Sequence, residues 1–418
     1  MITKNLNLLR FLALYVLAYT FPFPFGAIPW TDSIAEKLDS WIDVVILGIG
    51  HNIFGVTEEI HVHYSGSGDT TWHYLLLLSI LVFSTVLTYF WNLVRWPRWN
   101  AAALNYWLLW YTQLYLAFCM IQYGMVKIMM AQFTELSFQM LIEPYGNSSP
   151  MELAWAFFGF SKSYNLIIGL LEVVCAYLLL FRKTRMLGAL TGMVIMANVV
   201  IVNFVFDIPV KLYAIHILLF LAVVLAPDFK RLLSVILLNK PTDRVEYQEV
   251  FTDQKKVRIR RYVLWVFGIL VSINAIIGAF NFKSNWGDYA PEPPLYGLYE
   301  IQQFVINGNT LEPLLTDTVR WRYMAIDKPS TFEIYRMDKS MQRYSGVVDT
   351  RANELYYSSN SLKEERYKLS YHITDSIFHF ATVYQNDTIE GKARIWNKKD
   401  FPLLNRGFYW RTEYPNKR

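Results

Sequence analysis

A small set of ionisable and polar residues lies within long apolar stretches of this sequence. A charge in such surroundings is costly, so each one calls for a functional hypothesis. Lys127 and Glu172 are the two main candidates, because a lysine shielded from water can serve as a base. We predict them as catalytic residues. The side chains predicted to bind a substrate are Tyr123, Asn203, Asp207, His216 and Asp69.

Each of these residues also has a structural interpretation, which the sequence leaves open. Lys127 can extend to the membrane surface, with its stem buried, and a Lys–Glu ion pair lowers the cost of burying either charge without any catalysis. Asn203 and His216 can form contacts between helices. Asp69 lies in the loop before an apolar stretch, where it can cap a helix.

The composition divides the chain into two physically different parts. Of its 418 residues, 54% are hydrophobic and only 17% are charged, against about a quarter charged in soluble proteins. The apolar runs fill residues 7–281, whereas residues 282–418 resemble a soluble domain. The net charge is +5, and the Lys and Arg residues lie mainly between apolar runs. We therefore predict no nucleic-acid partner.

The first part is predicted to be a polytopic helical membrane domain over residues 1–281. A spanning helix needs about 20 apolar residues, and the first run is read as a retained helix, not a cleaved signal. Shorter amphipathic helices are expected at 34–49, 151–160 and 229–238. About seven spans are predicted, at 7–27, 73–94, 105–130, 163–181, 186–206, 211–227 and 262–281.

Basic residues predict the orientation of these helices, because they concentrate in short cytoplasmic loops. The loops after the second, fourth and sixth spans are rich in Lys and Arg, and the alternate loops are nearly bare. This places the N-terminus in the cytoplasm and residues 282–418 in the periplasm of a bacterial-type inner membrane. Lys127, Glu172, Asn203, Asp207 and His216 then fall in the outer half of the membrane, where we expect one shared polar pocket.

The second part, residues 282–418, alternates between apolar and polar positions, as short antiparallel strands do. We predict an all-β barrel or sandwich. Both cysteines, Cys119 and Cys175, lie in apolar runs, which excludes a disulfide framework for this domain. Gly297-Leu298-Tyr299 and Arg406 resemble positions in lipocalin-like barrels. The predicted strands are 298–306, 319–326, 331–337, 343–349, 354–358, 367–373, 376–385, 389–396 and 407–412.

Four histidines between the first two spans, His51, His61, His63 and His73, suggest a metal site. No Cys or closely spaced carboxylate completes a ligand set. We therefore predict no metal site.

Residues 73–235 resemble the DoxX-like superfamily of four-helix membrane proteins. The resemblance rests on Ile168-Gly169-Leu170-Leu171-Glu172, the basic turn at 182–185 and the helix that opens with Leu187-Gly188-Ala189. Gly124-x-x-Lys127 is also similar to the membrane domain of vitamin K-dependent γ-glutamyl carboxylases, where such a lysine is implicated as the base that deprotonates the reduced quinone. Those enzymes carry a second lysine where this chain has Val126, so carboxylation is not carried over.

These observations predict a membrane protein of a DoxX-like, quinone- or lipid-linked redox family, whose β domain covers the polar site. Quinone is the expected cofactor, and membrane lipid and membrane or periplasmic proteins are the expected partners. Two alternatives remain open. One is a non-catalytic scaffold or assembly subunit that anchors the β domain in a larger complex. The other is a transporter of a small molecule or lipid.

Overall fold

The computed structural model describes residues 5–28, 30–60, 62, 66–94, 101–242, 254–286, 289–359 and 366–415. The chain forms two compact units. The first consists of Met1–Phe133 and Leu153–Asn281, and the second consists of Thr134–Glu152 and Phe282–Arg418. Each unit is described by itself.

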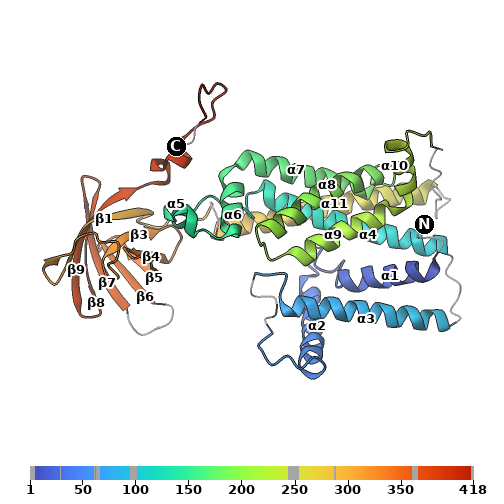
Figure 1. The fold of residues 1–418 in the computed structure, drawn as a ribbon, viewed down its shortest axis with the longest axis horizontal. Coiled ribbons are helices and arrows are strands. Elements are labelled where there is room, and N and C mark those ends of the chain that lie inside the picture. Colours follow the sequence, from blue (N-terminus) through green and yellow to red (C-terminus); the bar gives the residue numbers. More distant parts are fainter. Residues whose placement is uncertain are drawn as a thin grey trace. The chain divides into compact units, whose positions relative to one another are not determined.

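The first unit is helical (Figure 1). Its longest helix–helix interface joins α4 to α7, and α8 packs against both α7 and α9. The helices that lie wholly or mostly in this unit are α1 (Leu6–Thr20), α2 (Asp32–Asn52), α3 (Thr71–Leu93), α4 (Ala101–Ile128), α6 (Pro150–Phe160), α7 (Lys162–Leu180), α8 (Arg185–Val205), α9 (Lys211–Leu225), α10 (Phe229–Ile236) and α11 (Gln254–Trp286).

Five helices in the described part of the chain are long and apolar enough to cross a membrane, which makes this a multi-pass membrane protein. They are Thr71–Leu93, Lys162–Leu180, Arg185–Val205, Lys211–Ile236 and Gln254–Asn285. The expectation of about seven spans was therefore too high, because the stretches 7–27 and 105–130 do not meet this test.

Each of the two exceptions has a physical reason. α1 ends at Thr20, because Pro22 and Pro24 follow and proline cannot continue a helix. Its 15 residues extend only about 22 Å at the usual rise per residue, less than the hydrocarbon layer of about 30 Å. α4 has 28 residues, but Gln113, Gln122 and Lys127 reduce its hydropathy.

Apolar side chains lie both inside this unit and on its outer surface. Leu116, Leu179 and Leu221 are fully buried in the core. Exposed apolar residues on α7 and α8 include Leu170 and Ile201, as expected for helices that face lipid. α2 runs across the direction of α1 and α3 (Figure 1), and is the helix expected at 34–49.

The second unit is an eight-stranded antiparallel barrel, in which β1 pairs with both β3 and β9 and so closes the sheet. β2 extends β1 as a short hairpin. The barrel thus resolves the choice between barrel and sandwich. Its strands are β1 (Gly297–Ile306), β2 (Asn309–Thr310), β3 (Trp321–Ile326), β4 (Thr331–Arg336), β5 (Met341–Asp349), β6 (Glu354–Ser359), β7 (Arg366–Thr374), β8 (Ile377–Tyr384) and β9 (Asp387–Trp396).

The strand predicted at 407–412 is wrong. Closure between β1 and β9 leaves no free edge that another strand could join. Residues 407–412 contain no strand, and Arg406 follows a short helix, α12 (Pro402–Asn405), so its place before a last strand is also wrong. The turn at Asn307-Gly308 matches the expectation, with a positive φ at both residues, as tight hairpins require.

Aromatic side chains fill the barrel. Phe304, Phe332, Tyr344 and Tyr357 are each at most 2% exposed and form the centre of one apolar cluster. Arg320 is also buried and donates hydrogen bonds to backbone carbonyls of Leu311, Trp321, Ile301 and Gln302. These hydrogen bonds give the buried guanidinium the partners that a buried polar group needs.

The segment 134–152 belongs to the barrel unit, although the sequence placed it in the helical domain. α5 (Phe138–Ile142) inserts Phe138, which is fully buried, against Leu298, Ala325 and Tyr335 of the barrel. The backbone N–H of Phe138 donates to Asp327 Oδ2 at 3.2 Å. An apolar contact between segments far apart in sequence thus decides where this segment folds.

We expect Phe138→Ala to destabilise the barrel unit by about 3–5 kcal/mol, the usual cost of removing a buried phenyl ring. Pulse proteolysis of the full-length protein, read by mass spectrometry of peptides from residues 289–415, measures this. Tyr145→Ala is the control, because Tyr145 in the same segment is 80% exposed. Equal resistance of the two variants would contradict the packing role of Phe138.

Lys398, whose Nζ lies 5.7 Å from the centroid of the Phe138 ring, should make the packing of Phe138 on the barrel sensitive to alkaline pH. Burial lowers the pKa of Lys398, but the Asp327 carboxylate and the Tyr296 hydroxyl outweigh this and raise it above its usual value. A raised pKa in the folded state gives stability that is complete below the unfolded value of about 10.5 and is lost as the pH rises further. Pulse proteolysis between pH 9 and 12, in about one-unit steps, measures this. The natural protein should lose its resistance to the protease more steeply with rising pH than Lys398→Met does. Parallel pH profiles would refute this.

Candidate functional site

Two glycines bring α4 and α7 into close contact. A Cβ atom on Gly124 would lie 2.8 Å from the carbonyl oxygen of Gly169, and a Cβ on Gly169 would lie 2.6 Å from that of Gly124. Lys127 and Glu172 each follow one of these glycines by three residues. Residues three apart share a helix face, so the backbone contact places the two charged side chains opposite each other.

The two side chains form a buried ion pair. Lys127 Nζ donates to both carboxylate oxygens of Glu172, at 2.9 Å each, and the residues are 7% and 3% exposed. Lys127 Nζ also lies 5.4 Å from the ring centroid of Tyr123, within range of a cation–π contact. The predicted pair therefore exists and is shielded from solvent, and Lys127 does not extend to the surface.

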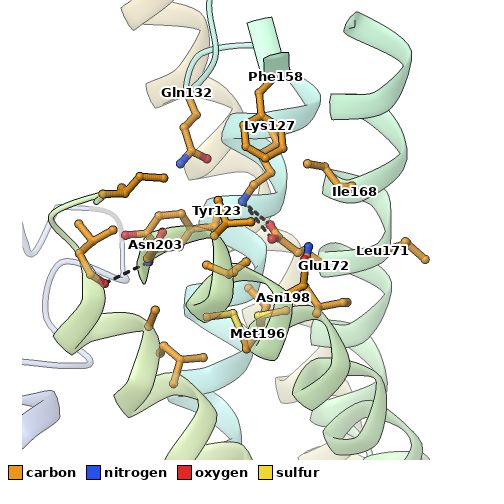
Figure 2. Close-up of a pocket in the computed structure, with 18 of the residues that line it drawn as sticks. Tyr123, Lys127, Gln132, Phe158, Ile168, Leu171, Glu172, Met196, Asn198 and Asn203 are labelled. Atoms are coloured by element: carbon orange, nitrogen blue, oxygen red, sulfur yellow. Dashed lines mark hydrogen bonds and ion pairs between the residues drawn. The ribbon is translucent and has the colours of Figure 1, made fainter. Parts of the chain in front are cut away.

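The pair lies on the wall of a cavity of about 410 Å³ between α4, α7, α8 and α9. Figure 2 shows Lys127 and Glu172 side by side, with Tyr123 and Asn203 nearby. Most of the lining is apolar. Aromatic side chains from α6 and from the loop after α4 also line the cavity, namely Trp155, Phe158 and Phe133.

Neutral polar groups complete the lining. Asn203 Nδ2 donates to the carbonyl of Val210 at 3.4 Å, which fixes the amide at the cavity wall. Gln132 Oε1 is buried and has no hydrogen-bond partner in the described part of the chain. An unpaired buried acceptor is costly, so Gln132 is suited to a hydrogen-bond donor on a ligand.

Asp69 and Asp207 do not line the cavity. Asp69 caps α9, because its carboxylate accepts hydrogen bonds from the backbone N–H groups of Lys211 and Leu212 at 2.8 and 2.9 Å. The side chain of Asp207 is 84% exposed and pairs with Lys211 at 2.8 Å. The expectation that Asp207 lies in the shared pocket is therefore wrong. Asp69, which was predicted to bind a substrate, lies at the start of α9 as well, and both residues secure that helix end.

His216 is also outside the cavity lining. Its Nδ1 lies 2.6 Å from the carbonyl of Leu212, its Nε2 lies 2.7 Å from the hydroxyl of Tyr15, and its ring stacks on Tyr19 at 4.1 Å. These contacts turn the imidazole toward α1. Its predicted place in the shared pocket is wrong, because a helix has several faces and depth alone does not decide which one a residue occupies.

Sequence reasoning missed Gln132, Trp155 and Tyr213 as lining residues. Tyr213 follows the α9 start and donates to Cys119 Sγ at 3.1 Å. Gln132 lies just past α4 and only four residues from its end, close enough to Lys127 to have been considered with it. Trp155 carried no such signal, because only the packing of α6 brings it to the cavity.

Of the four histidines considered as metal ligands, His51 and His73 do not line this cavity. His61 and His63 lie outside the described residues. His51 Nδ1 lies 2.8 Å from the carbonyl of Val56, and His73 Nδ1 lies 2.8 Å from Thr70 Oγ1.

Fold and site together define a class: a multi-pass helical membrane protein with an apolar internal cavity, a buried Lys–Glu pair and a separate β-barrel unit. The chain is 34% identical over 123 residues to the uncharacterized protein YwoB of Bacillus subtilis (strain 168), which covers 29% of this chain and 78% of that protein. The chain therefore belongs to the family of that protein. No family model and no solved structure matches the chain.

The glycine contact gives a direct test of how the pair is positioned. Gly169→Ala places a methyl group into the backbone of Gly124 and should destabilise the helical unit by about 2–4 kcal/mol, as overpacked sites do. Gly278→Ala on α11 is the control, because its Cβ would meet nothing within 4 Å. Thermal unfolding in detergent compares them, and a Gly169→Ala protein as stable as Gly278→Ala would refute the contact.

Proposed function

We propose that this protein binds a quinone in its intramembrane cavity, and that Lys127 and Glu172 hold the quinone headgroup. The observation that carries the proposal is the buried ion pair on the wall of an otherwise apolar cavity. Ion pairs inside membrane proteins are costly and mark functional sites by default. An apolar pocket with a few convergent polar groups is the usual form of a small-molecule site.

The donor arrangement suits a quinone carbonyl. An ammonium group carries three N–H donors, and Glu172 accepts two of those of Lys127. The third can donate to a carbonyl oxygen of a ligand. Gln132 is placed to accept from the hydroxyl of a reduced quinone, because its buried Oε1 has no partner among the described residues.

The rest of the lining suits the ring and tail of such a ligand. Phe133, Trp155 and Phe158 offer flat apolar surfaces for a quinone ring. Phe133 and Phe158 already stack on each other, with ring centroids 4.5 Å apart. A ring that enters here gains apolar burial without leaving a charged group unpaired.

The family resemblance supports the same proposal. The helices that form the cavity are those that resemble DoxX-like proteins, and Gly124-x-x-Lys127 is similar to the quinone site of γ-glutamyl carboxylases. In such a site Lys127 would act as the base that removes a proton from the reduced quinone, once its ammonium group has passed a proton to the neighbouring Glu172 carboxylate. We further propose a bacterial inner-membrane location, with the N-terminus in the cytoplasm and the barrel in the periplasm, on the distribution of Lys and Arg in the loops.

Three variants test the role of the pair: Lys127→Met, Glu172→Gln and the double variant. Each single change leaves one buried charge without its partner and should cost about 3–5 kcal/mol of stability. The double change removes both charges and should restore most of that stability. Native mass spectrometry of the protein purified gently from its membrane then measures bound quinone.

Loss of quinone from the stable double variant, with quinone present in the natural protein, supports the proposal. A natural protein that carries stoichiometric partner proteins and no quinone contradicts it. That result would favour the assembly-subunit alternative, in which the Lys127–Glu172 pair only stabilises the fold.

A further inference from the structure

α7 and α8 are in close contact at one end of the edge along which they pack, the α7–α8 interface. Cys175 Sγ on α7 donates to the carbonyl of Gly188 at 3.1 Å, and a Cβ on Gly192 would lie 3.0 Å from that sulfur. Gly188 itself lies against the backbone of Leu179, where a Cβ would be 2.7 Å from the nitrogen. Small residues thus hold the two helices together at this end.

Further along the same edge, the two helices line the cavity. On α7, the residues that precede Cys175 at intervals of three or four are Leu171, Ile168 and Tyr164, so they lie on the same helix face as Cys175. All three line the cavity. On α8, the same spacing from Gly188 and Gly192 leads to Ile195, Val199 and Val202, which also line it.

Several lining residues on these two helices are also exposed on the outside of the protein. Leu171 is 52% exposed and Val194 is 74% exposed, and Asn198 is exposed as well. Residues that line the cavity and are also exposed on the outer surface mark the rim of the cavity. Both helices are candidate membrane spans, so this rim faces lipid.

We infer that the cavity opens sideways into the bilayer between α7 and α8, and that its ligand is a neutral carbonyl-bearing headgroup on a long apolar tail that lies in this opening. The opening lies between Tyr164, Ile168 and Leu171 of α7 and Val194, Ile195, Asn198, Val199 and Val202 of α8, which are exposed or partly exposed lining residues. This inference rests on the proposed quinone site and extends it to the path and the class of ligand.

The charges of the cavity select the headgroup. Lys127 and Glu172 are the two charged residues among the described residues that line the cavity, and they neutralise each other. An anionic headgroup such as a phosphate would bring an uncompensated charge into an apolar site, which is costly. A carbonyl needs only a hydrogen-bond donor, which Lys127 supplies.

The opening is tested by tryptophan substitutions on its rim. Val202→Trp fills it from α8, and Ile201→Trp is the matched control, because Ile201 is the neighbouring residue and is 60% exposed on the lipid-facing side. Ile168→Trp fills it from α7, with Ile167→Trp, at a residue 56% exposed, as its control. Thermal unfolding first establishes that each purified full-length variant is folded.

Binding is then measured by tryptophan-fluorescence quenching in detergent micelles, with a polyprenyl benzoquinone and with the same benzoquinone lacking its tail. We expect both rim variants to bind the tailed quinone about tenfold or more weakly, which is about 1.4 kcal/mol. The rim variants should bind the tailless quinone with an affinity within about threefold of that of the natural protein. The two control variants should bind both quinones within the same range.

Two outcomes overturn the inference, and they differ from each other. If both rim variants bind the tailed quinone like the natural protein, the opening is wrong and the quinone site stands. If the natural protein binds neither quinone, the proposed function fails and the opening fails with it.

The headgroup preference has its own measurement. The natural protein should bind the polyprenyl quinone at least about tenfold more tightly than a polyprenyl phosphate of the same tail length. Glu172→Gln leaves the Lys127 cation uncompensated, so this variant should gain affinity for the phosphate and be stabilised by it in thermal unfolding. A natural protein that prefers the phosphate would show that the headgroup class is wrong.

Discussion

The close approach of two helix backbones determines the site of this protein. Gly124 and Gly169 allow α4 and α7 to pack without side chains between them, and Lys127 meets Glu172 only because of that contact. Either charge alone would be strongly unfavourable in this apolar region, whereas the bidentate pair satisfies two donors and both acceptors. The position of the charged pair thus depends on the glycine contact. A substitution at either glycine is expected to displace Lys127 relative to Glu172.

The pair also accounts for the character of the cavity. Because the two charges cancel, the cavity is polar at one point and electrically neutral as a whole. Such a site can orient a ligand by hydrogen bonds while most of its binding energy comes from apolar burial. The quinone that we propose as the ligand would meet both requirements, whereas the phosphate of a lipid headgroup would bring an uncompensated charge into the cavity.

The barrel unit is joined to the helical unit by more than one chain crossing. The chain enters the barrel unit after Phe133, returns at Leu153 and enters it again after Asn281. Phe133 and Trp155, which flank the excursion closely, both line the cavity. The contact of Phe138 with Leu298, Ala325 and Tyr335 explains why this excursion belongs to the barrel unit.

The class of the fold and the central pair of the site could be predicted from the amino-acid sequence. Hydropathy and strand alternation follow from local patterns, so the helical part, the β domain and most strands were predictable. Lys127 and Glu172 were predictable because a charge in an apolar stretch is conspicuous. The apolar composition of a stretch does not reveal where its helix ends, however, and α1 is shorter than predicted because two prolines follow it.

Only the tertiary structure decided which polar residues share the cavity. Asp207 and His216 were expected in it from their predicted depth, but Asp207 is exposed and pairs with Lys211, and His216 contacts the hydroxyl of Tyr15. Asp69 caps α9. Trp155 and the segment 134–152 were assigned by contacts between residues distant in sequence. Such contacts depend on helix rotation and on closure of the β1–β9 sheet, and neither is encoded in a local pattern of residues.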